Sequence, residues 1–221
     1  MCFSAAASFV TAGVTGAIGI AALTRTQHPR ELALAATPLL FAAQQAVEGL
    51  QWLDLPAAPD GPGSNGLTLL YLVFADVLWP IYAPLMVWLI EPSAWRRRFM
   101  LFWLAVGIGV AAFFLWWIFA RPHGALILDG HIAYVPDYKH SDAVSLAYLG
   151  ATCVPLVLSS RRTVVALGTI ILVGAAVAYL FYWETFTSIW CFFSAAASAV
   201  VLGHFERARR QRRREFGLQS G

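Results

Sequence analysis

Lysine is nearly absent from this chain, which carries it only at position 139. Charged residues of all kinds make up 12% of the sequence, whereas hydrophobic residues make up 59%. An ordinary soluble domain carries about 25% charged residues, so the composition favours an integral membrane protein. The single lysine lies outside the long apolar runs. This excludes a retinal protein, because retinal needs an intramembrane lysine for its Schiff base.

Several motifs of known chemistry are also missing from the sequence. It has no HExxH or CxxC spacing, no Gly-rich phosphate loop and no pair of histidines at haem-ligand spacing within an apolar run. It lacks the two matched halves with broken helices that are typical of many transporters. The net charge of +3 follows the placement of basic loops at a membrane, so we expect no nucleic-acid partner.

Long apolar runs dominate what the chain does contain. A bilayer core about 30 Å thick is crossed by roughly 20 helical residues. The runs of this length are 3–24, 31–53, 66–90, 98–119, 143–159, 163–183 and 185–205. They predict an all-α membrane protein, with a seven-transmembrane helix bundle over residues 1–206 and a basic cytoplasmic tail over residues 207–221.

The basic residues predict the orientation of these helices. All arginines except Arg121 lie in the segments 25–30, 96–98, 161–162 and 207–214, which fall on one side of the membrane if the runs alternate in direction. Cytoplasmic loops carry an excess of Lys and Arg. We therefore expect the N-terminus outside and the C-terminus in the cytoplasm, in a bacterial inner membrane. The basic tail would contact anionic membrane lipids.

The loop between the fourth and fifth predicted helices, residues 121–142, is the longest. Its stretch ALILDGHIAYV alternates loosely in hydrophobicity about Asp129-Gly130, a dipeptide typical of two-residue hairpin turns. The pattern predicts a small β-hairpin over the outer mouth of the bundle.

The first and last predicted helices begin with similar sequences. Residues 2–8 are CFSAAAS and residues 191–198 are CFFSAAAS. The small residues Ser4 and Ser8, like Ser194 and Ser198, repeat at a spacing of four, which permits close helix contact in lipid. The similarity favours either helix packing alone or a functional pairing of the two cysteines.

The second predicted helix carries a polar stripe. Gln44, Glu48, Gln51 and Trp52 share one face by their spacing, and Gln45 lies beside them. A polar stripe on a membrane helix is expected to face the bundle interior.

The third predicted helix combines a carboxyl group with two prolines. Pro80 lacks the N–H that would bond the carbonyl of Asp76, and Pro84 does the same to Pro80, so we expect a kink there. Apart from Arg98 at the first position of the run 98–119, no Lys or Arg lies within a predicted span, so Asp76 and Glu48 have no cationic side chain nearby. They would be protonated, held by neutral hydrogen-bond donors, or bound to a cation.

Ligand-type side chains gather near the predicted outer surface. Thiolate, imidazole and carboxylate groups together suit zinc or copper. The predicted metal ligands are Cys2, Glu48, His131 and Cys191, with His123 and His140 on the same loop. Removal of Met1 would let the amine of Cys2 chelate as well. A Cys2–Cys191 disulfide and unlinked thiols are the alternatives, and Cys153 is expected to be a small apolar filler.

A pocket for an apolar small molecule is a further prediction in the outer half of the bundle. Trp79 and Trp190 lie away from the membrane interfaces, where most other tryptophans are explained by an aromatic belt. The residues expected to form the pocket are Gln44, Gln45, Trp52, Asp76, Trp79, Tyr134, Glu184 and Trp190.

The segments MCFSAAASF, PLLFAAQQAVEGLQWL, GHIAY and SIWCFFSAAAS together resemble a family of bacterial multi-pass membrane proteins known as a domain of unknown function, DUF6629. The resemblance spans nearly the whole chain. It implies no activity, and it implies only that Cys2, Glu48, His131 and Cys191 belong to recurring motifs.

The sequence therefore predicts an integral membrane protein whose outward-facing polar and aromatic cavity binds a transition metal or a small ligand. One alternative is a non-enzymatic structural or transport protein with a Cys2–Cys191 disulfide. Another is a membrane-embedded, metal-dependent hydrolase. The seven-helix ceramidase-like hydrolases share the topology, but here every histidine except His204 lies outside the predicted spans, so their zinc site has no counterpart.

Overall fold

A computed structural model describes residues 4–55, 66–128, 130–135, 142–181, 190, 193, 195 and 197–219 of the chain. The helical elements are α1 (Ala5–Leu23), η1 (Pro29–Glu31), α2 (Leu32–Asp54), α3 (Gly66–Leu72), η3 (Val73–Leu78), α4 (Trp79–Ile90), α5 (Ala94–Ala120), α6 (Asp142–Val157), α7 (Arg162–Phe181) and α9 (Ser198–Gln219). The strands are β1 (Gly124–Leu128) and β2 (His131–Val135).

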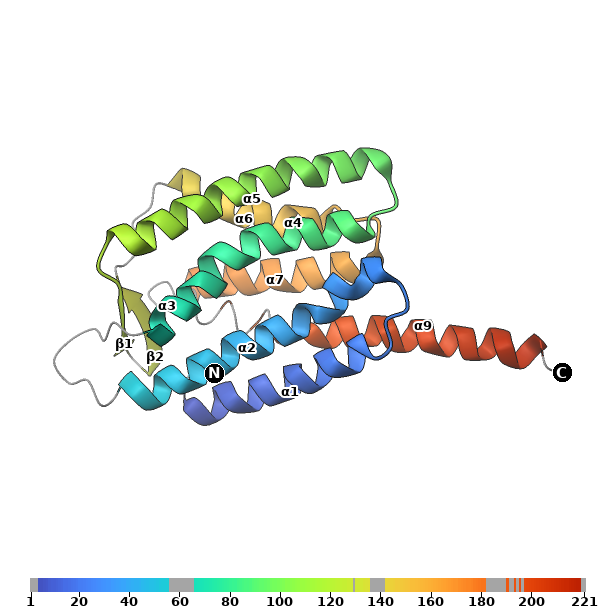
Figure 1. The fold of residues 1–221 in the computed structure, drawn as a ribbon, viewed down its shortest axis with the longest axis horizontal. Helices are drawn as coiled ribbons and strands as arrows, with labels where there is room; N and C mark the ends of the chain where they lie inside the picture. The colour runs from blue at the N-terminus through green and yellow to red at the C-terminus, as the bar shows by residue number, and fades with distance from the viewer. Residues whose placement is uncertain are drawn as a thin grey trace.

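The long helices lie side by side and alternate in direction along the chain (Figure 1). Among the described residues, four helices are long and apolar enough to cross a membrane: α1, the continuous stretch Gly66–Ile90, α5 and α7. Helix α6 is apolar but has only 16 residues. Helix α2 has 23 residues and carries the polar stripe. The four apolar helices give the chain the character of a membrane protein.

The two ends of the bundle differ in charge. The α1–α2, α4–α5 and α6–α7 connections lie at one end, and α9 projects beyond the other helices at that same end (Figure 1). This basic end carries the arginine clusters of segments 25–30, 96–98 and 161–162. An ion pair of 2.7 Å between Arg25 Nε and Glu206 Oε1 joins α1 to α9 there. The segment that joins α5 to β1, which contains Arg121, lies at the opposite end (Figure 1).

The predicted β-hairpin is confirmed. Strands β1 and β2 are antiparallel, with Leu128 paired to His131 and Gly124 paired to Val135. Gly130 adopts a φ of 77°, the left-handed conformation that a tight hairpin turn requires and that glycine adopts without strain. The hairpin packs on the ends of α2, α3 and α5 through an apolar cluster that includes Ala125, Ile132 and Tyr134.

The expected kink in the third helix takes the form of a π-helical segment, η3. Pro80, in the first turn of α4, has no N–H to donate to a carbonyl of this segment. The hydroxyl of Tyr148 on α6 donates to the Ala75 carbonyl, one residue before Asp76.

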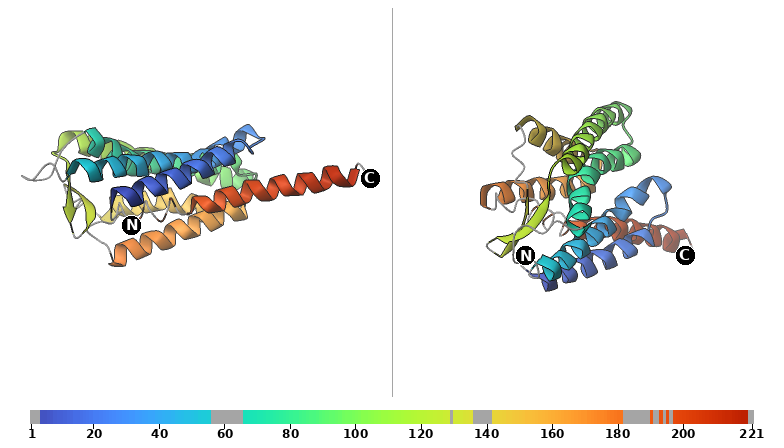
Figure 2. Two further views of the ribbon diagram at one scale, coloured as in Figure 1. Left: turned by 90° about the horizontal axis from the view of Figure 1, so that it is seen from below. Right: turned by 60° about the vertical axis from the view of Figure 1, so that its left-hand side comes forward.

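The first and last helices pack together, as their similar sequences favour. Helix α9 runs alongside α1 and then continues past the bundle (Figure 2). Ser8 on α1 and Ser198 on α9 are both fully buried, whereas Ser4 caps the start of α1 by accepting a bond from the N–H of Ala7. Helix α9 is continuous through Gln219, across the predicted domain boundary at residue 206. Ser194 lies outside the described residues.

Candidate ligand-binding site

The polar stripe of α2 faces the interior of the bundle, as its spacing predicts. Gln44, Gln45, Glu48 and Gln51 are all at most 1% exposed. Trp52 is only partly buried, because it lies at the edge of this face near the end of the helix. The buried amides need hydrogen-bond partners from neighbouring elements, and those partners decide where the stripe is anchored.

Gln51 connects three elements at the hairpin end of the bundle. Its Nε2 donates to Thr68 Oγ1 on α3 at 3.1 Å, and its Oε1 accepts a bond from the Tyr134 hydroxyl on β2 at 2.6 Å. The ring of Tyr134 stacks on that of Tyr71, with centroids 4.4 Å apart and planes 5° apart. The amide of Gln51 is therefore used at both ends, and Tyr134 serves to hold the hairpin on the helices.

Glu48 lies one turn before Gln51 on α2 and is fully buried. The Nε2 of Gln45 donates to its Oε2 at 3.0 Å. This bond supplies one neutral donor of the kind expected around a buried carboxyl group that has no cationic side chain nearby.

Gln44 orients Trp79 across the interface between α2 and α4. Trp79 Nε1 donates to Gln44 Oε1 at 2.8 Å, and both side chains are buried. The indole ring stacks on Phe41, with centroids 4.1 Å apart and planes 21° apart. Tyr82 contacts the indole edge-on at 5.9 Å. The polar edge of Trp79 therefore faces the stripe, and its apolar ring faces a pocket.

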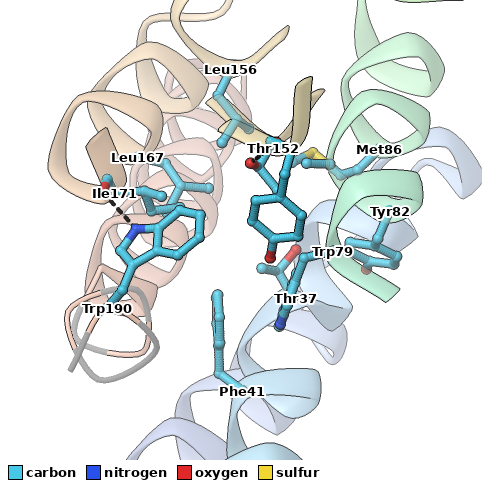
Figure 3. Close-up of a pocket in the computed structure, with 12 residues that line it drawn as sticks. Thr37, Phe41, Trp79, Tyr82, Met86, Thr152, Leu156, Leu167, Ile171 and Trp190 are labelled. Atoms are coloured by element: carbon cyan, nitrogen blue, oxygen red, sulfur yellow. Dashed lines mark hydrogen bonds between the residues drawn. The ribbon is translucent and has the colours of Figure 1, made fainter. Parts of the chain in front are cut away.

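This pocket lies between α2 and α4 on one side and α6 and α7 on the other, with Trp190 beside it (Figure 3). Its empty volume is about 490 Å³ when the space open to solvent is included, and about 40 Å³ of this can hold the centre of a water-sized sphere. The described residues that line it are Thr37, Phe41, Trp79, Tyr82, Ala83, Met86, Tyr148, Thr152, Leu156, Leu167, Ile171 and Trp190. The rings of Tyr148 and Trp190 meet edge to face at 5.6 Å. Aromatic and aliphatic side chains thus form nearly the whole wall.

The pocket shares some of its residues with the predicted one. Of the predicted pocket residues, Trp79 and Trp190 line it, and Gln44 acts behind Trp79. Gln45, Trp52, Asp76 and Tyr134 are described but do not line this pocket. The side-chain amides of α2 bond to residues of α3, α4 and the hairpin and to the carboxyl group of Glu48. The pocket reaches Leu156, near the end of α6, and Leu167, in the second turn of α7, so it extends towards the basic end of the bundle. Glu184 lies outside the described residues.

The sequence analysis missed Tyr82, Tyr148 and Thr152. Their spacing contains the signal: Tyr148, Thr152 and Leu156 recur every four residues on one face of α6 and all line the pocket. Thr37 and Phe41 show the same spacing on α2. Which helix each face meets cannot be read from these intervals, so the pocket itself was not predictable from them.

The predicted metal ligands are only partly within the described residues. Glu48 is fully buried and His131 is 8% exposed on β2, so His131 is not a freely exposed loop residue. Among the residues that the structure describes, no group of three or more His, Cys, Asp or Glu side chains is arranged to hold a metal ion. Cys2, His140 and Cys191 lie outside the described residues, and so does the alternative to a metal site, a Cys2–Cys191 disulfide. Cys153 is a buried free thiol within the apolar core, in keeping with a filler.

A second carboxylate is held at the basic end by serines. Glu91, 3% exposed, accepts bonds from the hydroxyls of Ser159 and Ser160 and from the N–H groups of Ser93 and Ser160. Burial alone would raise the pKa of this carboxyl. The bonds from Ser160, Ser93 and Ser159 together outweigh burial and leave the pKa below its ordinary value. Glu91 thereby joins the α4–α5 and α6–α7 connections.

A family model described as a family of unknown function (DUF6629) matches residues 1–216. The chain belongs to this family. The match includes every helix and strand described above except the last three residues of α9. No curated protein and no solved structure shows a significant match to this DUF6629 protein. The geometry of its own residues therefore carries the functional argument.

Proposed function

We propose that this DUF6629 protein is a seven-helix membrane protein that binds an apolar small molecule in the pocket between α2, α4, α6 and α7. The observation that carries the proposal is the pocket itself, whose described wall contains no charged side chain and five aromatic ones. The space in which the centre of a water-sized sphere fits is about 40 Å³, above the roughly 10–15 Å³ that a single water needs.

Several features of the helices support a bundle in which seven helices span the membrane. The polar residues of α2 are buried in the bundle, so they do not prevent this 23-residue helix from spanning lipid. The 16 residues of α6 rise about 24 Å, a short span that local bilayer thinning can accommodate. Arg97 stacks on Trp88 near one end and Arg121 on Trp117 near the other, the pairing of aromatic and basic residues expected at two interfaces.

The orientation follows from charge. The arginine-rich connections and α9 share one end of the bundle, which the positive-inside rule assigns to the cytoplasm. The β-hairpin and the N-terminus are then on the outer side, in a bacterial inner membrane. Membrane lipid surrounds the bundle in this arrangement and is also a route by which an apolar ligand would reach the pocket.

Binding of naphthalene to the full chain in lipid nanodiscs tests the proposal. Trp79 and Trp190 line the pocket, so bound naphthalene changes the tryptophan fluorescence in a saturable way. Ala83→Phe adds a ring within the pocket wall and removes the saturable part, whereas non-specific partitioning into lipid remains. The proposal fails if wild type and Ala83→Phe respond alike.

A transition-metal site is a second proposal, with copper or zinc bound by Cys2 and Cys191 together with Glu48 and His131. Its support is the packing of α1 against α9, since these helices follow the two cysteines in the sequence. Thiolate and imidazole groups are suitable ligands for either metal. Such a site would also be needed for any metal-dependent hydrolysis.

Elemental analysis of the purified protein separates this proposal from a disulfide. A metal site gives about one copper or zinc per chain in the wild type and in Cys153→Ser, but not in Cys2→Ser. A disulfide gives no metal, and a single reactive thiol, Cys153, after denaturation of a chain with three cysteines. Absence of metal together with three reactive thiols would contradict both.

A further inference from the structure

A second, smaller pocket lies at the basic end of the bundle. The described residues that line it are Glu31, Leu34, Ile90, Arg161, Thr163, Val164 and His204. About 10 Å³ of this pocket can hold the centre of a water-sized sphere, which is close to the roughly 10–15 Å³ that a single water needs. The small pocket therefore has room for one group of the size of an oxygen atom.

The small pocket is polar, unlike the large one. Arg161 can donate hydrogen bonds to a group in it, and Glu31 can accept them. The Nδ1 of His204 lies 3.0 Å from Thr163 Oγ1, which places the imidazole of α9 against α7. One guanidinium and one carboxylate balance each other in charge. The site therefore suits an uncharged polar group better than an anion or a cation.

The two pockets follow one another along the same three helices, α2, α4 and α7. On each helix the residues that line them lie about one turn apart, or roughly 5 Å. The pairs are Leu34 and Thr37 on α2, Ile90 and Met86 on α4, and Val164 and Leu167 on α7. Met86 has a flexible side chain, which can turn aside for a ligand that extends from one pocket into the other.

The large pocket offers almost no polar partner to a ligand. The indole N–H groups of Trp79 and Trp190 donate to protein acceptors at 2.8 and 2.9 Å. The hydroxyl groups of the wall donate to backbone carbonyls, and those of Tyr82 and Thr152 each make a further side-chain bond. The surface that the wall presents is almost wholly apolar. A polar group placed there would lose its bonds to water, whereas a hydrocarbon chain would not.

We propose that the ligand is a straight-chain amphiphile with an uncharged hydroxyl head, such as a long-chain alcohol. Its chain lies in the large pocket, and its hydroxyl lies in the small pocket between Glu31, Arg161 and His204. This inference rests on the proposed ligand-binding function and specifies the class of ligand. The head is then at the basic end and the chain points into the bundle, as the lipids of that membrane leaflet are oriented. The amphiphile can thus enter from this leaflet without turning over.

Three probes of equal chain length test the inference with the full chain in lipid nanodiscs: dodecanol, dodecane and dodecanoate. The measurement is the saturable change in tryptophan fluorescence. The response of Ala83→Phe is subtracted to remove lipid partitioning, or that of Thr152→Leu if Ala83→Phe does not fold. Hydrogen bonds to the charged side chains should make dodecanol bind at least about tenfold more tightly than dodecane. Dodecanoate should bind at least about tenfold more weakly than dodecanol, because its head is larger and anionic.

A variant of the small pocket shows where the head binds. His204→Phe should reduce the affinity for dodecanol and leave that for dodecane unchanged. Arg161→Gln serves the same purpose if His204→Phe does not fold. Arg162→Gln, at an exposed position of the same end that lines neither pocket, is the matched control and should keep the preference for dodecanol.

The outcomes separate this inference from the proposed function. Equal binding of dodecanol and dodecane would mean that the small pocket holds no head group, whereas apolar binding stands. Tight binding of dodecanoate, or a preference for dodecanol that survives both His204→Phe and Arg161→Gln, would likewise overturn the assigned head. If no probe binds saturably to the wild type, the proposed function fails and this inference with it.

Discussion

Gly107 of α5 lies directly against the backbone carbonyl of Pro80 in α4, so closely that a Cβ atom at position 107 would overlap the Pro80 oxygen. This carbonyl lacks its usual helical donor, because the residue four positions later is Pro84. The Cα–H of Gly107 fills the space that a side chain or another donor would occupy. A glycine on one helix thus matches a break in the hydrogen bonding of its neighbour, next to the pocket residues Trp79 and Ala83.

Gly107→Ala should destabilise the bundle by separating α5 from α4. Overpacking of this kind costs about 1–3 kcal/mol. Gly109→Ala is the matched control, since nothing lies within 4 Å of a Cβ atom placed there. Alanine favours a helix over glycine by up to about 1 kcal/mol, so the control is neutral or slightly stabilising. Thermal unfolding in detergent should show a lower Tm for Gly107→Ala only, and equal Tm values would argue against this contact.

Tyr134→Phe should loosen the β-hairpin while leaving the helices intact. The substitution removes the donor to Gln51 and keeps the ring stacked on Tyr71. The loss of one buried hydrogen bond costs about 1 kcal/mol, more if the Gln51 oxygen is left unpaired. Hydrogen exchange should become faster in β1 and β2. Ile127→Thr, at a 40% exposed position of β1, is the control and should cause little change. Unchanged exchange in Tyr134→Phe would show that the bond to Gln51 does not help to hold the hairpin.

Stability at acid pH should depend on Glu91. The folded-state pKa of this carboxyl lies below its ordinary value of 4.5. Its contribution to folding is therefore fully present above about that pH and is lost as the pH falls through the folded-state pKa. Glu91→Gln should lower the Tm at neutral pH and flatten the decline below pH 4.5. Asp142→Asn removes an exposed carboxyl and is the control. An unaltered acid decline in Glu91→Gln would mean that other groups cause it.

The parts of the fold that could be predicted from the sequence depend on residues that lie close together along the chain. The spacing of Gln44, Gln51 and Glu48 predicts one buried face, because a helix has a fixed period. The dipeptide Asp129-Gly130 marks the hairpin turn, since glycine accepts the φ of 77° found at position 130. Helix boundaries agree within a few residues for most segments, because apolar run lengths set them.

The site was less predictable, because it depends on contacts between distant residues. The bonds from Trp79 to Gln44 and from Tyr148 to Ala75 span 35 and 73 positions. Nothing in the local pattern says which helix faces meet. The spacing of the polar α2 residues therefore does not show that Gln44 bonds Trp79, whose ring lines this pocket. Two of the serines that bond Glu91 lie 68 and 69 positions away, so no local pattern singles out this carboxyl.

Topology is open to a direct labelling experiment. A cysteine introduced at Gly63, in the connection between α2 and α3, should react with a membrane-impermeant reagent on intact cells. A cysteine introduced at Gln211, in the basic part of α9, should react only after the cells are permeabilised. Both variants are made in a chain whose three native cysteines are replaced by serine. Labelling of Gln211→Cys from outside would overturn the proposed orientation.

The occupancy of the pocket is the central claim, and mass spectrometry of the intact protein released from membrane extracts tests it most directly. Wild-type protein should carry a bound apolar molecule, seen as a discrete added mass and recovered in an organic extract. Ala83→Phe, purified in the same way, should lack that mass and keep its non-specific lipid. The same bound molecule at equal occupancy in both proteins, or none in either, would contradict the account.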